Sequence, residues 1–399
     1  MRVLLTTSTF PLAPDDGTPR FVLDLAQSLA ASCPVTVLAP GAPGTAARER
    51  WGDVSVVRFA YFRPQAWQRL AYADGIEVNL RQSWLARLQA APFVLAQARA
   101  VRRLVERERV DVVNSHWIVP QGLAAALARG RGRRFAHVVS LHGGDVHALV
   151  RLPLGRRLAG FVAARSDAWL ASSQAARDRF DAVLGRACHA QIQPMGVHAA
   201  RFRAALPLPG AEVDVPAGYL LYVGRLQEIK GVSVLLRALP AVRARHPDLS
   251  LLVVGYGEQE APLRREAEAL GIAAAVAFAG RRPADFVARA MRGCEAVVVP
   301  SVRLASGREE GMPTVVAEAL AAGARVVATA TGGIPDLVRH GENGWLCRDS
   351  DPAALSAAIL AALEAPRPPA AGDRAGAEAL DWSSVAERHL EVYRSVSGA

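Results

Sequence analysis

A chain of 399 residues, of which 51% are hydrophobic and 21% are charged, is too long for one hydrophobic core and predicts two domains of roughly 200 residues each. This composition excludes a disordered protein, and no apolar run reaches the ~18 residues of a membrane-spanning helix. The four cysteines are scattered, which is typical of a reducing compartment, so we place the protein in the cytoplasm.

Positive charge is concentrated in the first half of the chain. Residues 1–210 contain 27 arginines and 14 acidic residues, a net charge of +13, whereas residues 211–399 have a net charge of −3. A basic half favours an anionic partner, such as nucleic acid, a membrane surface or a charged substrate. A solvated, arginine-rich face explains the same count equally well.

Short apolar runs alternate with amphipathic helical segments along the chain. In the first half, the expected strands are 2–6, 34–39, 54–59, 110–115, 137–143 and 168–173. After the Pro- and Gly-rich stretch 205–218, strands are expected at 219–224, 249–255, 275–280, 296–300 and 324–329. This alternation predicts an α/β protein of two Rossmann-like domains with parallel sheets, 1–204 and 205–380. A C-terminal helix at 381–396 is expected to pack back on the first domain.

The segment 60–109 interrupts the alternation. It carries Trp67 and Trp84 among nine arginines and four acidic residues, a net charge of +5. Basic amphipathic helices with tryptophan bind anionic bilayers, but such helices also cover sheets. Both interpretations of this segment stay open.

The motif GREEGMPTVVAEALAAG follows an expected strand at 307–323. Gly311 allows the backbone to approach a ligand closely, and Pro313 fits the first turn of a helix that we expect to begin near Met312. The free amides and the dipole of such a helix form an anion site at the carboxyl end of the strand. The expected anion-binding stretch therefore runs from Gly311 through Met312 and Pro313 to Thr314.

Two glutamates flank this anion site. Glu318 lies five residues beyond Pro313, which corresponds to roughly 7.5 Å along a helix axis. That is about the distance from a diphosphate to a ribose. In other nucleotide sites, a carboxylate accepts hydrogen bonds from the ribose hydroxyls. Glu310 precedes the helix and lies nearer to a group attached to the phosphate.

Lys230 is the only lysine of the chain, whose other 46 basic side chains are arginine. It lies in VGRLQEIKG at 223–231, in a loop expected on the same edge of the sheet as 307–323 and as GGIP at 332–335. A compact ammonium can follow an oxygen on which charge develops, whereas Arg225 can grip two oxygens in a fixed fork. Survival of one lysine by codon drift is the alternative explanation.

These motifs resemble those of the retaining glycosyltransferases of family 4, which have the GT-B fold, with two Rossmann-like domains whose parallel sheets face a central cleft. The family signature is a glutamate, seven residues and a second glutamate, and Glu310 and Glu318 have this spacing. Other segments resemble the family in the expected order, namely FPLAPDDGTPRFVLDLAQSLA at 10–30, VTVLAPG at 35–41, SLHGGDVH at 140–147 and QPMGVHAARF at 193–202.

The resemblance implies a hexosyltransferase that moves a sugar from a nucleotide-diphosphate donor to a hydroxyl acceptor with retention of configuration, in cell-surface polysaccharide or glycolipid synthesis. Arg225 and Lys230 would hold the diphosphate, Glu318 the ribose and Glu310 the donor sugar. The implied partners are the donor, a glycan or lipid-linked acceptor and, through the basic first half, the anionic inner face of the membrane. Uracil and guanine donors both remain open.

The first domain would contribute His142 and Gly17. The resemblance implies that His142 reaches the donor sugar and that Gly17 offers its backbone amide to the phosphate. The alternative for His142 is a loop histidine bonded to backbone, and we expect Asp145 to cap the next helix. The sequence departs from the family at Asp16-Gly17-Thr18, where many relatives have paired glycines, and 60–109 shows no acceptor pattern.

No metal or other cofactor is expected, because Arg225 and Lys230 can replace Mg²⁺ at the leaving group. The Asp-x-Asp sequence at 349–351 is typical of an N-cap, with Pro352 opening the next helix.

Three other classes of function compete with this interpretation. An oxidoreductase is disfavoured because VGYGEQE at 254–260 lacks the third glycine of a dinucleotide motif. A basic nucleic-acid-binding protein is disfavoured because no RNA-type aromatic motif accompanies the arginines. A protein that binds nucleotide sugars without turnover is disfavoured by the complete set of Arg225, Lys230 and the two glutamates.

Overall fold

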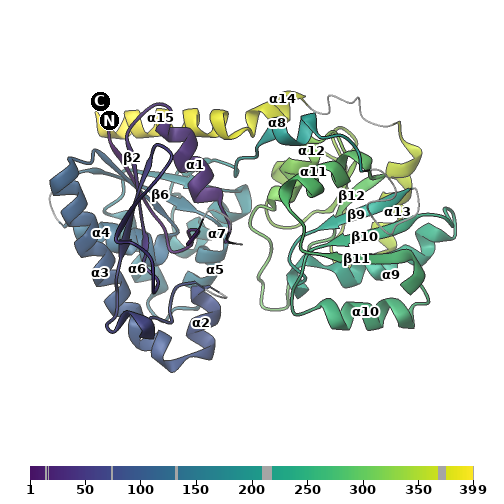
Figure 1. Cartoon of the computed structure of the whole chain (residues 1–399), viewed down its shortest axis with the longest axis horizontal. Helices are drawn as coiled ribbons and strands as arrows, with labels where there is room; N and C mark the ends of the chain where they lie inside the picture. Colours follow the sequence, from purple (N-terminus) through teal and green to yellow (C-terminus); the bar gives the residue numbers. More distant parts are fainter. Residues whose placement is uncertain are drawn as a thin grey trace. The chain divides into compact units, whose positions relative to one another are not determined.

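The computed structural model describes residues 1–13, 16, 18–72, 75–130, 134–208, 218–366 and 374–398 (Figure 1). The chain forms two compact units: unit 1 comprises Met1–Met195 and Trp382–Ala399, and unit 2 comprises Gly196–Asp381. The change of unit at Gly196 precedes the stretch 205–218 at which we expected it. The reason is that α8 (Ala199–Ala204) buries Ala199 and Phe202 in the core of unit 2.

Unit 1 is built on one sheet with the strand order β3-β4-β2-β1-β5-β6-β7-β8. Its strands are β1 (Val3–Thr6), β2 (Val35–Pro40), β3 (Arg48–Trp51), β4 (Val54–Phe59), β5 (Val112–His116), β6 (Ala136–Leu141), β7 (Ala168–Ala171) and β8 (Gln191–Ile192). All neighbours pair in parallel except β3 with β4. The order reverses between β1 and β5, and open parallel sheets bind ligands beside such a reversal.

Helices cover both faces of this sheet because successive side chains of each strand point to opposite faces. Val3 and Leu5 of β1 pack with α1 (Phe21–Ala30) and α15 (Trp382–Ser397), whereas Leu4 packs on the opposite side with α3 (Trp84–Glu108). The remaining helices of unit 1 are α2 (Ile76–Gln82), α4 (Leu123–Arg129), α5 (Gly144–Arg151), α6 (Gly155–Ala163) and α7 (Gln174–Leu184).

Unit 2 has a parallel sheet with the order β11-β10-β9-β12-β13-β14, so that its reversal lies between β9 and β12. The strands are β9 (Tyr219–Val223), β10 (Ser250–Val254), β11 (Val276–Gly280), β12 (Ala296–Val299), β13 (Val326–Thr329) and β14 (Trp345–Cys347).

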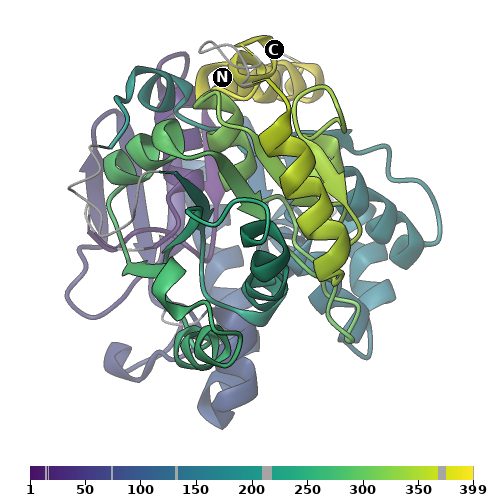
Figure 2. The ribbon, with the colours of Figure 1, turned by 90° about the vertical axis from the view of Figure 1, so that its right-hand side faces the viewer.

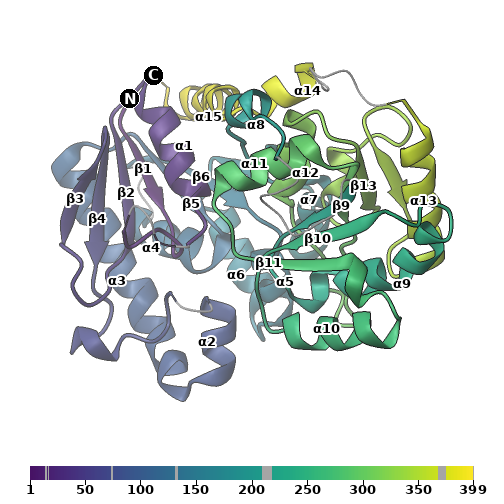
Figure 3. The ribbon, with the colours of Figure 1, turned by 45° about the vertical axis from the view of Figure 1, so that its right-hand side comes forward.

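The helices of unit 2 also lie on both faces of its sheet. One apolar cluster joins the sheet to α9 (Val232–Arg243), α10 (Glu260–Ala269) and α13 (Pro352–Glu364), and Figure 2 shows α9 and α13 side by side. A second cluster joins the other face to α11 (Ala284–Gly293) and α12 (Thr314–Ala321), which Figure 3 shows on the side away from α10. The short helix α14 (Arg374–Ala379) follows α13 in the sequence.

The prediction of two α/β domains with parallel sheets is confirmed, but the strands β3, β8 and β14 were not predicted. β3 is a polar edge strand with the sequence RERW, and β8 and β14 are too short to produce an apolar pattern.

The segment 60–109 contains α2 and α3, and α3 both covers the sheet and keeps an exposed face. Phe93 and Val101 of α3 are fully buried against the sheet, whereas Trp84, Leu88 and Leu95 are 71%, 61% and 47% exposed. Within the described ranges, no helix is long and apolar enough to cross a membrane.

The packing of α15 against the sheet of unit 1 includes a buried hydrogen bond. Tyr393 is fully buried, and its hydroxyl accepts a hydrogen bond of 2.8 Å from the Asn114 Nδ2 group. We predict that Tyr393→Phe lowers the local free energy of unfolding by about 1–3 kcal/mol, because the buried Asn114 donor loses its partner. Faster hydrogen exchange in α15 peptides would measure this loss. Tyr256→Phe is the control, since Tyr256 is 40% exposed, and equal exchange in both variants would contradict the prediction.

Candidate functional site

Two loops of unit 2 meet beside the reversal of strand order. The first, residues 224–231, follows β9, and the second, residues 300–313, follows β12. Because β9 and β12 are adjacent and parallel, both loops leave the sheet at its carboxyl edge. The Arg225 and Lys230 side chains belong to the first loop, and Glu310 belongs to the second.

Lys230 and Glu310 form an ion pair between these loops. Lys230 ends the short 3₁₀ helix η4 (Glu228–Lys230), and its Nζ lies 2.6 Å from Glu310 Oε2. The two side chains are 22% and 15% exposed, so the pair is partly shielded from water while still reachable by a ligand. Partial burial strengthens such a pair and limits the positions that the flexible lysine can adopt.

Two glycines allow the loops to approach closely enough for this pair. Gly231 has a φ of +67°, and a Cβ at this position would lie 1.8 Å from the Pro300 carbonyl oxygen. Gly332 has a φ of +58°, and a Cβ there would lie 1.8 Å from the Glu310 carbonyl oxygen. Any other residue would therefore combine a strained backbone with a collision against the neighbouring loop. The GGIP motif thus packs directly on the backbone of Glu310.

The neighbouring Glu309 has a different role from that of Glu310. Its carboxylate accepts a hydrogen bond of 3.3 Å from Thr331 and pairs with Arg303 at 3.0 Å. Glu309 is therefore engaged in holding the loop, which leaves Glu310 to face Lys230.

The helix after this loop begins later than we expected. α12 starts at Thr314, and Pro313 is its N-cap residue, with φ −74° and ψ 111°, rather than part of the first turn. Gly311 and Met312 lie in the loop and are partly exposed. Among the described residues, no side chain caps this N-terminus. Its amides are thus available to an anion.

Glu318 lies on α12, one helical turn beyond Thr314. Its side chain is partly buried. Burial raises the pKa of Glu318 to about 7, an effect that Arg201 and His198 partly oppose. A carboxyl with this pKa changes charge near neutral pH, so it can switch between donating and accepting a hydrogen bond.

Arg225 lies over an aromatic ring. It is exposed, and its guanidinium carbon lies 5.0 Å from the centre of the Tyr256 ring. Arg281 approaches the same ring at 6.0 Å. Tyr256 and Arg281 were not among the predicted site residues. Each follows a strand of the parallel sheet, Tyr256 after β10 and Arg281 after β11, at the same edge as Arg225, and this position could have indicated them. In the sequence, VGYGEQE has the pattern of an incomplete dinucleotide motif only.

In unit 1, His142 lies at the carboxyl end of β6 within a cluster of rings. The ring centre of His142 lies 5.2 Å from Phe21 and 5.1 Å from Trp117, and His142 Nε2 lies 3.1 Å from His116 Nδ1. Trp117 has a φ of 76°, a costly conformation for a bulky side chain, which the surrounding structure must enforce. His116 and Trp117 were not predicted as site residues.

Asp145 connects the two loops that carry these rings. Its carboxylate accepts hydrogen bonds from the backbone amides of His142 at 3.0 Å and Ile118 at 2.9 Å. Asp145 is buried, and burial raises its pKa, while these hydrogen bonds oppose the rise. We expected a simple helix cap, but Asp145 instead bridges the loops after β5 and β6. Gly17, the other predicted site residue of unit 1, lies outside the described residues.

The predicted cap at 349–351 is present. Asp351 Oδ1 accepts a hydrogen bond of 3.0 Å from the Ala354 amide, and Pro352 is the first residue of α13. In the part of the chain that the structure describes, no cluster of three or more His, Cys, Asp or Glu side chains is placed to hold a metal ion.

Comparisons with known proteins agree with this arrangement. The family models "Glycosyltransferase Family 4" and "Glycosyl transferases group 1" match residues 16–201 and 212–378. A GDP-mannose-dependent phosphatidylinositol monomannoside mannosyltransferase from Mycolicibacterium smegmatis is 31% identical over 74% of this chain and 79% of its own length. The chain belongs to the family 4, group 1 glycosyltransferases.

This glycosyltransferase is also similar to other proteins in sequence or in structure. Glycogen synthase from Mycobacterium tuberculosis is 30% identical over 71% of this chain and 69% of its own. Sucrose-phosphate synthase from Thermosynechococcus elongatus superposes with a TM-score of 0.76 at 21% identity, covering 99% of this chain and 98% of the other. The Anabaena protein HepE, solved with UDP, gives a TM-score of 0.71 at 20% identity, covering 99% of each chain. The GT-B fold expected for this glycosyltransferase is therefore confirmed.

The raised pKa of Glu318 predicts how the stability of unit 2 depends on pH. Folded Glu318 keeps its proton up to a pH of about 7, whereas the unfolded side chain releases it near 4.5. The folded state binds more protons between these values, so the free energy of unfolding falls as the pH rises through this range. We expect hydrogen exchange of α12 peptides to accelerate from pH 5 to pH 8 more in the parent protein than in Glu318→Gln, after correction for intrinsic exchange. A parallel pH response of the two proteins would disprove the shift.

Proposed function

We propose that this glycosyltransferase moves a hexose from a nucleotide-diphosphate sugar to a hydroxyl group with retention of configuration. The observation that carries the proposal is the pair of Lys230 and Glu310 beside the uncapped N-terminus of α12, at the reversal of strand order. This arrangement offers an ammonium that Glu310 holds in place and helix amides that no side chain of the described residues caps. A diphosphate needs both when it leaves a sugar.

The leaving group determines the role of Lys230. As the bond between the anomeric carbon and the diphosphate breaks, negative charge grows on the phosphate oxygens and the sugar becomes oxocarbenium-like. Glu310 holds Lys230 at 2.6 Å before the donor arrives. A donor phosphate would take over the ammonium, which frees the Glu310 carboxylate to contact the sugar. Arg225, which is exposed, would supply a second cation at the diphosphate.

The remaining proposed roles are those that the family resemblance implies. Glu318 would accept hydrogen bonds from the ribose hydroxyls in its ionised form. His142 of unit 1 would contact the sugar of the same donor. The acceptor hydroxyl would attack the anomeric carbon from the face that the diphosphate leaves, and its proton would pass to a phosphate oxygen. Because the chain's own cations supply the charge at the leaving group, we propose no metal requirement.

The named relatives support this class of substrate. The mycobacterial mannosyltransferase that is 31% identical uses GDP-mannose and a phosphatidylinositol monomannoside, and HepE was solved with UDP. We therefore propose a nucleotide sugar as donor and a glycan or lipid-linked hydroxyl as acceptor, in cell-surface polysaccharide or glycolipid synthesis.

We also propose that unit 1 binds the anionic inner face of the membrane. The α3 face, defined as Trp84, Leu88 and Leu95, forms an exposed apolar stripe at helical spacing. Exposed arginines, including Arg87 and Arg99, lie on the same helix. Apolar side chains flanked by arginine suit the boundary between acyl chains and anionic headgroups.

The leaving-group role of Lys230 is testable with a defined donor. Melting curves with UDP-glucose, GDP-mannose and ADP-glucose identify the donor, because the bound nucleotide sugar stabilises the protein by mass action. We predict that Lys230→Ala keeps the fold and lowers nucleotide release from that donor by at least ~10²-fold, the scale for one preorganised charge.

Arg237→Ala is the matched control for this prediction. Arg237 lies on α9, the helix that follows η4 in unit 2, and pairs with Glu266 at 2.7 Å, but it is 60% exposed. Lys230→Arg separates charge from shape, since it keeps the charge on a larger, planar group, and we expect it to remain impaired. Turnover of Lys230→Ala equal to that of Arg237→Ala would refute the assigned role.

Membrane binding has its own test. We predict that Leu88→Glu lowers affinity for vesicles containing phosphatidylglycerol by about tenfold or more, because burial of one leucine contributes about 1.5–3 kcal/mol. Co-sedimentation with vesicles measures the change. Leu206→Glu, at a position 76% exposed in unit 2, is the control. If both variants bind like the parent protein, or if the parent binds neutral phosphatidylcholine vesicles equally well, the proposed surface is wrong.

A further inference from the structure

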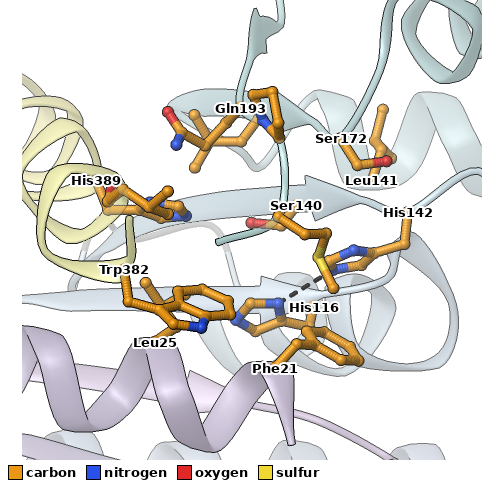
Figure 4. A pocket seen from close by; sticks show the side chains of 14 residues that line it. Phe21, Leu25, His116, Ser140, Leu141, His142, Ser172, Gln193, Trp382 and His389 are labelled. Atoms are coloured by element: carbon orange, nitrogen blue, oxygen red, sulfur yellow. Dashed lines mark hydrogen bonds between the residues drawn. The ribbon is translucent and has the colours of Figure 1, made fainter. Parts of the chain in front are cut away.

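A small cavity in unit 1 lies between the carboxyl ends of β5 and β6 and the helix α15. Its volume is about 20 Å³, and its lining includes His116, His142, Gln193 and His389. Figure 4 shows His389 and Trp382 of α15 on one side of this cavity and His142 on the other, with His116 between them. His116 and His389 are only 2% and 5% exposed. The proposed function uses only His142, so the other polar groups remain to be explained.

The contact between His116 and His142 is a hydrogen bond between coplanar rings. His116 Nδ1 lies 3.1 Å from His142 Nε2, and the ring planes differ by 18°. The ring centres are 5.3 Å apart, which exceeds the nitrogen separation by about two ring radii. The rings therefore lie edge to edge rather than face to face, in the geometry that directs a proton on one nitrogen at the lone pair of the other.

Burial favours the neutral form of both histidines. Burial, followed by the neighbouring His389, lowers the pKa of His142 to about 3. Burial, followed by His142 and His389, lowers the pKa of His116 well below its usual value. In a neutral pair, only one of the two facing nitrogens carries a proton. The tautomer of His142, and thus whether its Nδ1 donates or accepts, is therefore tied to that of His116.

The other side of His116 faces a polar environment. His116 Nε2, Gln193 Nε2 and Ser172 Oγ are buried and have no hydrogen-bond partner within the described residues, and all three residues line the cavity. A buried polar group without a partner costs about 1–3 kcal/mol, and a cavity of this size holds about one water. Any of these polar groups gains a partner from such a water.

His389 of α15 presents a hydrogen-bond acceptor to this cavity. Its Nδ1 lies 2.8 Å from the Val385 carbonyl oxygen, which can only accept, so Nδ1 carries the proton and Nε2 is an acceptor. Gln193 Nε2 can only donate, and Gln193 Oε1 already accepts from Arg388 at 3.2 Å. Fixed donors and acceptors around one small cavity favour one proton arrangement of His116 over the other.

We propose that His116 is a positioning residue that fixes the ring orientation and the tautomer of His142 through their Nδ1–Nε2 hydrogen bond, while the polar cavity closed by α15 fixes His116. This inference rests on the proposed function, in which His142 contacts the donor sugar. A histidine with one fixed tautomer presents either a donor or an acceptor to a sugar hydroxyl, and a free ring would present both. Loss of His116 should therefore impair the chemical step more than donor binding, because the diphosphate contacts lie in unit 2.

The first test needs no substrate. Nitrogen-15 spectra of the histidine side chains in the full-length protein distinguish protonated from unprotonated ring nitrogens. We expect His142 to give one nitrogen of each type in the parent protein and averaged nitrogens in His116→Phe. His116→Asn, whose amide can still reach His142 Nε2, should retain the separated signals. His137→Asn is the matched control, because His137 is fully buried on the same sheet and bonds Ser115 and Arg165 instead.

The second test measures nucleotide release from whichever of UDP-glucose, GDP-mannose and ADP-glucose stabilises the protein. We expect His116→Phe to lower kcat by about 10- to 100-fold, the scale of a misplaced catalytic contact, with KM for the donor changed only a few-fold. His116→Asn should recover part of the rate. A loss in His137→Asn as large as that in His116→Phe would reduce the effect to general destabilisation and overturn the inference.

These outcomes separate the inference from the proposed function. If His142→Ala loses activity while His116→Phe keeps both the separated signals and the rate of His137→Asn, His116 does not position His142, but the proposed function stands. If His142→Ala turns over normally, the role of His142 at the donor fails, and the positioning role fails with it.

Discussion

The candidate site depends on one interaction, the ion pair between Lys230 and Glu310, which joins the loops that follow two adjacent parallel strands. The 2.6 Å contact exists because β9 and β12 are neighbours at the reversal of strand order. It also requires glycine at positions 231 and 332, where the carbonyl oxygens of Pro300 and Glu310 leave no room for a side chain. The sheet order and the loop glycines are thus what place an ammonium beside the N-terminus of α12.

Much of this arrangement could be predicted from the sequence because its signals are local. The buried strands are continuous apolar runs, and most appear within two residues of their expected positions. The spacing of Glu310 and Glu318 lies within one motif, so a helix between them was foreseeable even though its start at Thr314 was not. A proline in the sequence GMPT fits both the first turn and the N-cap, and only the backbone angles distinguish them.

The parts that escaped prediction depend on contacts between distant segments. Asp145 bridges to Ile118, and His116 meets His142, because β5 and β6 are paired in register. Neither contact can be recognised from a repeating pattern in the sequence. The segment 60–109 was ambiguous for another reason. Its helix α3 buries one face on the sheet and exposes Trp84 and Leu88 on the other, so its composition fits a sheet-covering helix and also leaves an apolar exposed face.

The singular identity of Lys230 has a practical consequence. Because no other lysine occurs in the chain, the ε-amine that is paired with Glu310 is chemically unique, and its side chain is 22% exposed. Apart from the N-terminus, an acylating reagent therefore meets one target, at the edge of the sheet where the strand order reverses. The rate at which the Lys230 amine is acylated therefore reports whether this site in unit 2 is open or occupied.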